Sequence, residues 1–585
     1  MSRGKTIGLS VLAVLFAGGA LAYMYRDSIG SSAITYLTRD LIGPRPAFQN
    51  DSQKVRTEWV EMRDGTRLFT RIYLPEGEGP WPTLLVRDAY QFQRYLTCHY
   101  YVRYGFACVH QDVRGQGESE GEWYPLRHEQ SDGQDTLAWL TAQEFQNRNV
   151  ALIGGSYLGL SQWAVASDLP DQVKTIVPTT SHGDFYEMVY RNGSFTQGVA
   201  GLWSAEIFYP LSEKQDAADK WMEEVVPLRP AVDAPRDQFK DAWTSYSDYI
   251  RHPDKTDAYW QQDYYQNLRT AHRSVDVPVL WIARWHDFFL EGTLEQFDEL
   301  PTRDESLLLI QPGQHAGLTA DLNYEAVGYT EFATTLAWLN HHLKGQPLPD
   351  KLRSNVIYYE NGADRWQQAS KWPRKAGSSV ELQLADLDAS ANCGGALTPD
   401  LKIESLEPTR FAYDPADPVR TNGGAFMLNP NFAPSAVAEQ SDTACQRKDI
   451  LSFRSLPYGD GLHISGDISI ELSVSSSAPD TSFTVKLSEV FADGRVCNIR
   501  DDITTLSSQG QAGANPALLK FDLMPIDWTL KPGSRLQLDV SSSNFPAFPA
   551  HTNTEGLWSE ATESKIAEQT LYSGRLKLTI TDKKQ

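Results

Sequence analysis

The first half of the chain alternates between short apolar runs and longer amphipathic stretches. Compact apolar runs that end in polar residues predict strands, and apolar residues at helical spacing predict helices. The predicted strands are residues 67–75, 83–90, 106–112, 149–157, 277–287 and 306–315, and the predicted helices are 131–143, 160–168 and 332–349. Alternation of this kind predicts an α/β domain built on a largely parallel sheet.

Two regions depart from this alternation. Residues 186–264 are rich in Trp, Tyr and acidic residues and carry helical signals at 216–226 and 236–250, which predicts a helical insertion. After residue 350 the chain turns to short alternating strands separated by turn residues, which predicts a β-sandwich. These strands are expected at 354–360, 378–385, 466–477, 481–491, 534–543 and 574–582.

These patterns divide the chain into three folded parts. We expect an α/β domain at 46–185 and 265–348, interrupted by a helical cap at 186–264, and an all-β domain at 349–585. At the N-terminus, residues 1–30 hold a short basic segment and an apolar run that ends in an A-x-A-like site. This segment predicts either a membrane anchor or a cleaved signal, and in both cases export, with no other contact with the membrane.

Charge and cysteine content limit the candidate functions. The net charge is −22, which argues against a nucleic-acid partner because phosphate binding requires clustered Lys and Arg. The five cysteines lack C-x-x-C spacing, so a zinc site is not expected. Cys393 and Cys445 lie in polar segments and could form a disulfide in an exported protein, whereas Cys108 is expected to be a buried small side chain.

Two serines compete for the role of nucleophile. Ser119 lies in GESEG, which matches G-x-S-x-G, but two glutamates flank it and no apolar helix follows, so a polar loop is predicted. Ser156 follows an apolar strand and two glycines and precedes a helix. Strand, sharp turn and helix expose a hydroxyl and direct the next amide, that of Tyr157, at an oxyanion. Ser156 is therefore the predicted nucleophile.

A nucleophilic serine needs a general base. Two later predicted strands end at Asp287 and His315, and the carboxyl ends of such strands meet at one edge of a sheet. We expect His315 to take the proton from Ser156 while Asp287 orients its ring. His286 is turned away from its neighbour by strand alternation, and His110 lies inside a strand, where a packed or hydrogen-bonded role is expected.

Together these segments resemble the cocaine-esterase and X-Pro dipeptidyl-peptidase group of α/β-hydrolases, which includes glutaryl-cephalosporin acylases and α-amino-acid ester hydrolases. Residues 104–121 are similar to its D-x-R-G-x-G-x-S-x-G loop, and residues 154–159 to its G-x-S-Y-x-G segment. Residues 356–373 and 540–556 resemble its C-terminal domain. The resemblance covers nearly everything after residue 55. It implies an α/β-hydrolase sheet with an inserted helical cap, followed by an all-β jelly-roll domain.

The resemblance also implies an oxyanion donor. In the family a tyrosine in a segment like R-x-P-Y donates its hydroxyl; here that position is Tyr90, with Ala89 in place of the proline. α-Amino-acid ester hydrolases carry acidic residues where this chain has Phe289 and Leu290, which implies a substrate with an uncharged acyl side. The expected pocket residues are Trp285, Phe288, Phe289 and Leu290.

The sequence thus predicts an exported serine hydrolase that cleaves an ester or amide bond of a small molecule or short peptide without a metal or organic cofactor. One alternative is X-Pro dipeptidyl-peptidase activity, which needs an acidic residue to hold a peptide N-terminus; Glu187 and Glu291 are the nearest candidates. The other is a catalytically inactive binding or adhesion protein on the same scaffold. The intact Ser, Asp and His at strand ends argue against that alternative.

Overall fold

The structure is a computed structural model of the whole chain. The residues that it describes are 54–90, 96–208, 217–232, 244–315, 329–372, 378–385, 394–399, 407–426, 436–440 and 445–581. The N-terminal segment expected to be a signal or anchor, residues 1–30, lies outside this described part. Within the described part, none of the helices combines the length and apolar character needed to cross a membrane.

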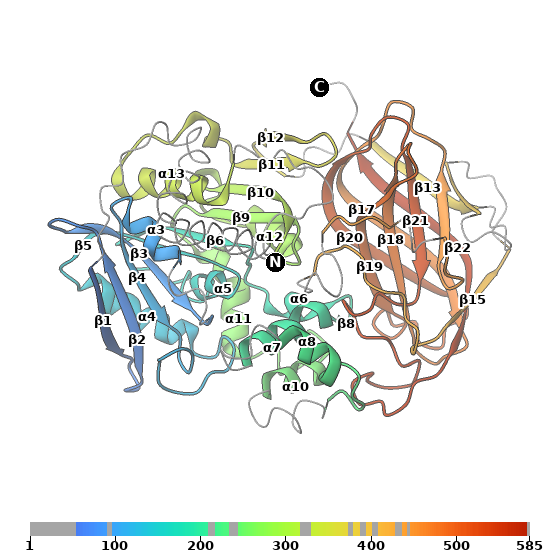
Figure 1. Cartoon of the computed structure of the whole chain (residues 1–585), viewed down its shortest axis with the longest axis horizontal. Helices are drawn as coiled ribbons and strands as arrows, with labels where there is room; N and C mark the ends of the chain where they lie inside the picture. The colour runs from blue at the N-terminus through green and yellow to red at the C-terminus, as the bar shows by residue number, and fades with distance from the viewer. Residues whose placement is uncertain are drawn as a thin grey trace, which may run out of the picture.

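The first half of the chain forms one mixed ten-stranded sheet (Figure 1). Its strand order is β1-β2-β4-β3-β5-β6-β9-β10-β11-β12, and neighbours from β4 through β11 run parallel. Because neighbours run in one direction, the strands from β4 to β11 end at one edge of the sheet. The strands are β1 Lys54–Glu61, β2 Arg67–Leu74, β3 Trp81–Asp88, β4 Ala107–Asp112, β5 Gln146–Gly155, β6 Val173–Thr179, β9 Leu280–His286, β10 Leu307–Gln314, β11 Val356–Glu360 and β12 Arg365–Ala369.

Helices connect and cover these parallel strands, as the alternating sequence pattern predicts. Contacts between elements place α5 against β3, β5 and β6, and α13 against β5, β6 and β9. The α13 helix begins at a Thr330 cap and ends at Gly345, whose left-handed backbone (φ 66°) suits a residue without a Cβ. The helices of this part are α3 Leu96–Val102, α4 Glu129–Thr141, α5 Tyr157–Trp163, α12 Leu290–Asp298 and α13 Glu331–Lys344.

The predicted helical insertion is present between β6 and β9. Its helices gather in the lower centre of Figure 1, between the mixed sheet and the second domain. The insertion also contains a short hairpin, β7 Tyr190–Arg191 and β8 Ser194–Phe195, and two short π-helical stretches at Gln197–Gly201 and Trp221–Val225. Its helices are α6 Phe185–Val189, α7 Leu202–Phe208, α8 Ala217–Lys220, α10 Thr244–Arg251 and α11 Asp263–Thr270.

The C-terminal part is a second ten-stranded sheet system, drawn in orange and red at the right of Figure 1. Its order is β19-β18-β21-β16-β14-β13-β22-β17-β20, with β15 paired to β22. The strands are β13 Ser378–Ala385, β14 Gly395–Thr398, β15 Thr409–Tyr413, β16 Leu451–Ser455, β17 His463–Ser476, β18 Ser482–Val490, β19 Val496–Thr505, β20 Ala517–Thr529, β21 Arg535–Ser541 and β22 Ala567–Ile580.

One predicted strand belongs to the other domain. The segment 354–360 was expected to open the all-β domain, but its strand β11 pairs in parallel with β10 and antiparallel with β12, which extends the first sheet. The expected boundary at residue 349 is therefore too early. Four successive apolar or aromatic residues in β11 are buried, as in an inner strand, and the periodicity of the sequence does not show which sheet buries them.

Backbone and side-chain hydrogen bonds connect the two domains directly after β11. The Asn361 amide donates to the Asp527 carbonyl at 3.1 Å, and the Thr529 amide donates to the Asn361 carbonyl at 2.8 Å. Arg191 of the β7–β8 hairpin donates to Asp502 of β19 at 2.8 Å. The all-β domain therefore contacts both the first sheet and the helical insertion.

The close contact between α5 and β6 gives a test of the packing. A Cβ added at Gly159 would lie 2.5 Å from the Ser181 Cβ, so we expect Gly159→Ala to lower the free energy of unfolding by roughly 1–3 kcal/mol, although alanine favours a helix. The matched control is Gly459→Ala, where an added Cβ meets nothing within 4 Å. Urea unfolding should show a loss for the first variant alone; equal stability of both would contradict the packing.

Candidate active site

The turn between β5 and α5 holds Ser156 in a strained conformation. Its φ of 56° and ψ of −125° are rare for a residue with a side chain and cost on the order of 1–3 kcal/mol. The turn is closed by the Ser156 amide, which donates to the Thr179 carbonyl at 2.9 Å, and by the Gly159 amide, which donates to the Ser156 carbonyl at 2.8 Å. Ser156 therefore has the geometry of a nucleophile elbow at the carboxyl end of a central strand.

The glycines around Ser156 explain why the motif departs from G-x-S-x-G. A Cβ on Gly154 would lie 2.5 Å from the Cβ of Leu158, so the large residue at 158 is accommodated only because residue 154 has no side chain. The position where the helix meets the neighbouring strand is Gly159, next to Ser181. The glycine that allows close packing is therefore residue 159, one position after the second glycine of G-x-S-x-G.

Ser119 has a structural role in the loop after β4. Its hydroxyl donates to the Asp112 carbonyl at 2.6 Å and accepts the Phe69 amide at 2.8 Å. Both hydrogen bonds join the loop to the neighbouring strands, so the hydroxyl already acts as a donor and as an acceptor within the loop. The GESEG segment is therefore a polar loop, as its flanking glutamates predicted.

Tyr90 follows β3 and contacts the candidate nucleophile. Its hydroxyl lies 3.1 Å from the Ser156 Oγ and accepts a hydrogen bond from the Trp203 Nε1 at 3.0 Å. Burial raises the pKa of Tyr90 to about 12, against the opposing hydrogen bonds from Ser156, Trp203 and the Tyr157 amide. The phenol therefore stays protonated at neutral pH and can donate to a developing negative charge.

Trp203 was not identified from the sequence. It lies in α7 of the cap, is buried, and stacks on Tyr157 with ring centroids 5.9 Å apart and planes at 21°. The Tyr157 ring is held in turn, because its hydroxyl donates to the buried Glu129 and accepts the Leu126 amide. Trp203 thus contacts the side chains of Tyr90 and Tyr157, the two residues of the candidate oxyanion site. It is one of 16 tryptophans, and no local pattern distinguishes it.

Asp287 and His315 meet at the same edge of the sheet, after β9 and β10. The His315 Nδ1 lies 2.9 Å from the Asp287 Oδ2, and the other carboxylate oxygen accepts the Phe289 amide at 2.7 Å. Both side chains are buried. Donation from Nδ1 to Asp287 leaves the lone pair on Nε2, which is the tautomer of a general base.

A second contact fixes the loop that carries His315. Arg284, on β9, donates to the His315 carbonyl at 2.6 Å and to Glu331 of α13 at 2.7 Å. The imidazole is also covered on one side by Phe288, whose ring lies 4.5 Å away at 24°. The sequence analysis did not identify Arg284, and its place directly before Trp285 gives no indication of this contact.

The Ser156 hydroxyl is directed at Tyr90. Although Ser156 and His315 both belong to the described part of the chain, no hydrogen bond joins them, and the serine Oγ uses Tyr90 as its partner. In enzymes without substrate such contacts are often long and form only in the reactive complex. Rotation about the Ser156 Cα–Cβ bond is the one side-chain movement that redirects its hydroxyl.

Comparison with known proteins shows the family to which the chain belongs. Residues 64–317 match the family described as X-Pro dipeptidyl-peptidase (S15 family), and residues 351–577 match its C-terminal non-catalytic domain. The chain is 30% identical over 546 residues to cocaine esterase from Rhodococcus sp. (strain MB1 Bresler), covering 85% of this chain and 92% of that protein. The chain belongs to the cocaine-esterase and X-Pro dipeptidyl-peptidase family. As a member of this family, it is a serine hydrolase.

Solved structures of this fold agree along most of the chain. An aminopeptidase from a marine sediment archaeon, Thaumarchaeota archaeon, aligns with a TM-score of 0.75 at 21% identity and covers 92% of this chain and 98% of that chain. An α-amino-acid ester hydrolase aligns with a TM-score of 0.76 at 22% identity and with the same coverage. These likenesses show an α/β-hydrolase-type sheet followed by a β-rich domain.

The expected pocket residues of this family member are mostly buried. Trp285 is fully buried and donates to the Tyr359 carbonyl at 2.6 Å while packing on Trp372, so it belongs to the core between β9 and β11. Phe289 and Leu290 are also inaccessible. Only Phe288, beside His315, keeps an exposed part. Phe288 and Phe289 both lie beside the His315 ring, whereas Trp285 packs in the core, and the pocket lined by all four residues stays a prediction.

Two acidic residues had been considered for binding a peptide N-terminus. Glu187 lies 3.3 Å from the Lys255 Nζ, and Glu291 forms an ion pair with Arg191. Burial raises the pKa of both carboxyls, and these cations oppose the rise. Each carboxylate thus already has a cationic partner, although Lys255 also pairs with Asp184 and Arg191 also pairs with Asp502.

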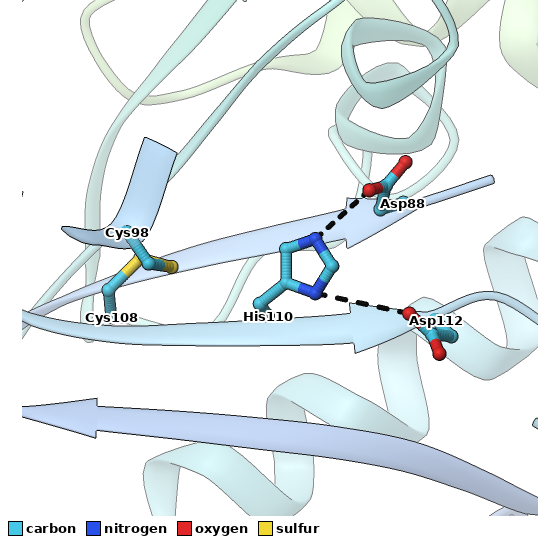
Figure 2. Close-up of a disulfide and its surroundings, with 5 residues drawn as sticks. All are labelled: Asp88, Cys98, Cys108, His110 and Asp112. Atoms are coloured by element: carbon cyan, nitrogen blue, oxygen red, sulfur yellow. Dashed lines mark hydrogen bonds and ion pairs between the residues drawn. A yellow bond between two sulfur atoms is a disulfide. The ribbon is translucent and has the colours of Figure 1, made fainter. Parts of the chain in front are cut away.

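His286 and His110 lie in environments different from that of His315. His286 is buried, and burial lowers its pKa well below the usual value, with Arg500 of β19 adding to the effect. It faces the all-β domain, away from Asp287, as strand alternation predicted. His110 is buried beside Asp88, with its Nε2 3.0 Å from the Asp88 Oδ2, which agrees with the predicted hydrogen-bonded role (Figure 2).

One group of ligand-type side chains lies away from the active site. In the described ranges, only Glu360, His463 and Asp527 place three such atoms within 4.8 Å of one another. The His463 Nε2 lies 2.9 Å from the Asp527 Oδ1, and Ser465 and Thr529 donate to the two carboxylates. The group lies where β11 meets β17 and β20, so it contributes hydrogen bonds to the contact between the domains.

The cysteines differ from the prediction in one respect. Cys108, expected to be a free buried side chain, forms a disulfide with Cys98 that joins β4 to α3 (Figure 2). Spacing of ten residues across a loop gave no indication that the two would lie together. Cys445 is disulfide-bonded, while its expected partner Cys393 lies outside the described residues. Cys497 is buried and is not part of a disulfide.

Proposed function

We propose that this serine hydrolase forms its acyl-enzyme on Ser156, with His315 as the general base and Asp287 as the group that orients it. The observation that carries the proposal is the strained Ser156 turn, whose hydroxyl lies 3.1 Å from the protonated Tyr90 phenol. Strain at one residue persists only where the surrounding structure maintains it, and it concentrates at functional sites. The His315–Asp287 pair at the same sheet edge supports the assignment.

The proposed reaction has two stages. Ser156 rotates toward His315, the imidazole Nε2 takes the hydroxyl proton, and the Oγ forms a bond with the substrate carbonyl carbon. The imidazolium then gives that proton to the leaving alcohol or amine as its bond to the carbonyl carbon breaks. In the second stage water attacks the acyl carbon while His315 takes a proton from that water. The imidazolium gives this proton to the Ser156 Oγ as its bond to the acyl carbon breaks, and the acid is released. Asp287 stabilises the imidazolium in both stages.

The oxyanion of each tetrahedral intermediate is proposed to bind between the Tyr90 hydroxyl and the Tyr157 amide. The raised pKa of Tyr90 supports this role because the phenol keeps its proton, and so remains a donor, at neutral and moderately alkaline pH. Trp203 donates to the Tyr90 oxygen, which leaves the phenolic proton free to turn toward the substrate.

We propose an ester or amide with an uncharged acyl side as the substrate. Phe289 and Leu290 stand where an ammonium-binding subgroup has acids, and Glu187 and Glu291 already pair with Lys255 and Arg191. A substrate ammonium entering this region would have to displace one of these cations. The alternative, X-Pro dipeptidyl-peptidase activity, requires such an acidic partner.

We also propose the finer architecture and location expected from the sequence. The helical segment 186–264 would act as a cap on the active site, supported by the contact between its Trp203 and Tyr90. The all-β domain would be a jelly roll, which its mainly antiparallel pairing favours. Export through residues 1–30 is supported by the disulfide between Cys98 and Cys108, since such bonds persist in oxidising compartments.

The nucleophile is tested with a fluorophosphonate probe on purified protein. Ser156→Ala should abolish covalent labelling and lower kcat for a p-nitrophenyl ester by at least ~10³-fold, because no hydroxyl remains to form the acyl-enzyme. Ser119→Ala is the matched control and should be labelled like the wild type, since its hydroxyl only joins the loop to β2 and β4. Labelling of Ser156→Ala, or loss of labelling in Ser119→Ala alone, would refute the assignment.

Substrate preference is tested by comparing p-nitrophenyl butyrate with an Ala-Pro p-nitroanilide. We expect kcat/KM to favour the ester strongly, because the dipeptide's ammonium finds Glu187 and Glu291 already paired. A third substrate, the N-acetylated Ala-Pro p-nitroanilide, controls for the leaving group and the amide bond. Faster cleavage of the free dipeptide than of its acetylated form would show that the chain recognises a peptide N-terminus.

A further inference from the structure

The backbone of Tyr90 is held by a buried carboxylate. The Tyr90 amide donates to the Asp88 Oδ1 at 2.5 Å, which closes a short turn immediately after β3. A turn of this kind, from a side-chain oxygen to the amide two residues later, restricts the backbone at the residues it encloses. Ala89 between them has only a methyl side chain, so the carboxylate is the group that fixes the direction in which Tyr90 leaves the strand.

Asp88 is held in turn by His110 from the neighbouring strand (Figure 2). The second carboxylate oxygen lies 3.0 Å from the His110 Nε2, and both side chains are 2% exposed or less. The register of β3 and β4 pairs Asp88 with Asp112 and Val86 with His110. Asp112, 4.0 Å from the other His110 nitrogen, is itself bound by Arg71 at 2.9 Å. The contacts thus run from Arg71 across two strands to the Tyr90 amide.

Stability alone does not account for this arrangement. Removing a carboxylate and an imidazole from water costs several kcal/mol, and apolar residues of similar size often serve packing as well or better. What the pair does that apolar residues cannot do is bind one particular amide, that of Tyr90. The hydroxyl of the same residue contacts Ser156 and Trp203. Tyr90 is therefore held at its backbone amide by Asp88 and at its phenol oxygen by Trp203.

We propose that Asp88 and His110 are positioning residues for the oxyanion donor: His110 orients the Asp88 carboxylate, and Asp88 fixes the Tyr90 backbone so that the phenol reaches Ser156. The inference rests on the proposed function of Tyr90. It adds two residues that touch neither substrate nor nucleophile and act only through Tyr90. Displacement of a catalytic group by about 1 Å can cost about 100-fold in rate, so a loosened Tyr90 affects the chemical step more than substrate binding.

The test is a double-mutant cycle on p-nitrophenyl butyrate hydrolysis. Tyr90→Phe alone should lower kcat by about 100-fold, as expected for loss of one oxyanion donor. Asp88→Ala and His110→Leu, each in the wild-type background, should lower kcat about tenfold with KM nearly unchanged. In the Tyr90→Phe background the same two substitutions should change kcat by less than about twofold, since residues that act through a group lose their effect when it is absent.

Two further variants separate positioning from general loosening. Asp88→Asn keeps an oxygen that can accept the Tyr90 amide and should restore most of the kcat lost in Asp88→Ala. The double variant Cys98→Ala/Cys108→Ala removes the disulfide from the same strand, two residues before His110, and should lower the Tm while leaving kcat close to that of the wild type. A similar loss of kcat in this double variant would assign the effect to β4 as a whole and overturn the proposal.

The outcomes distinguish the two claims. If Tyr90→Phe lowers kcat but Asp88→Ala and His110→Leu lower it by the same factor in both backgrounds, the positioning role is overturned and the oxyanion role of Tyr90 stands. If Tyr90→Phe leaves kcat unchanged, the proposed function of Tyr90 fails and the positioning role fails with it. Should Asp88→Ala not fold, the cycle is completed with His110→Leu, and an equal loss of kcat in both backgrounds there overturns the proposal.

Discussion

The structure depends on one strained turn, in which Ser156 takes a backbone conformation that residues with a side chain avoid. The strain is maintained by two constraints. The parallel strands β5 and β6 fix the position where the turn begins, and α5 packs so closely behind it that only glycine fits at residue 159. As a result a hydroxyl is presented above the carboxyl edge of the sheet, where the loops after β3, β9 and β10 also arrive.

Around this turn, buried polar contacts determine how the side chains of the candidate site are oriented. Tyr90 is held by Asp88 and Trp203, and His315 by Asp287 through its ring and by Arg284 through its carbonyl. The contacts of Trp203, Asp287 and Arg284 join segments far apart along the chain, whereas the contact of Asp88 with the Tyr90 amide spans only two residues. Each contact uses groups whose burial would be costly without a partner. The site is thus built from groups that are already oriented before substrate binds, which is the condition for electrostatic stabilisation of a transition state.

Sequence patterns predicted the features that arise locally. The strand, glycine pair and helix around Ser156, and the strands that end near Asp287 and His315, follow from the order of apolar and polar residues within about ten positions. The contact between Trp203 and Tyr90, the disulfide between Cys98 and Cys108, and the pairing of β11 with the first sheet depend on which distant segments meet. The periodicity of apolar residues in a single sequence does not show which distant segments contact one another. It also does not give side-chain direction at a strand end, and Trp285 packs in the core.

The most direct measurement of the central claim is a crystal structure of the protein after reaction with a small alkyl fluorophosphonate. The account predicts phosphorus bonded to the Ser156 Oγ, with its free oxygen about 3 Å from both the Tyr90 hydroxyl and the Tyr157 amide. It also predicts the His315 Nε2 within about 3 Å of the Ser156 Oγ. A phosphoryl oxygen bound elsewhere, or a His315 ring that remains out of contact with the adduct, would contradict the account.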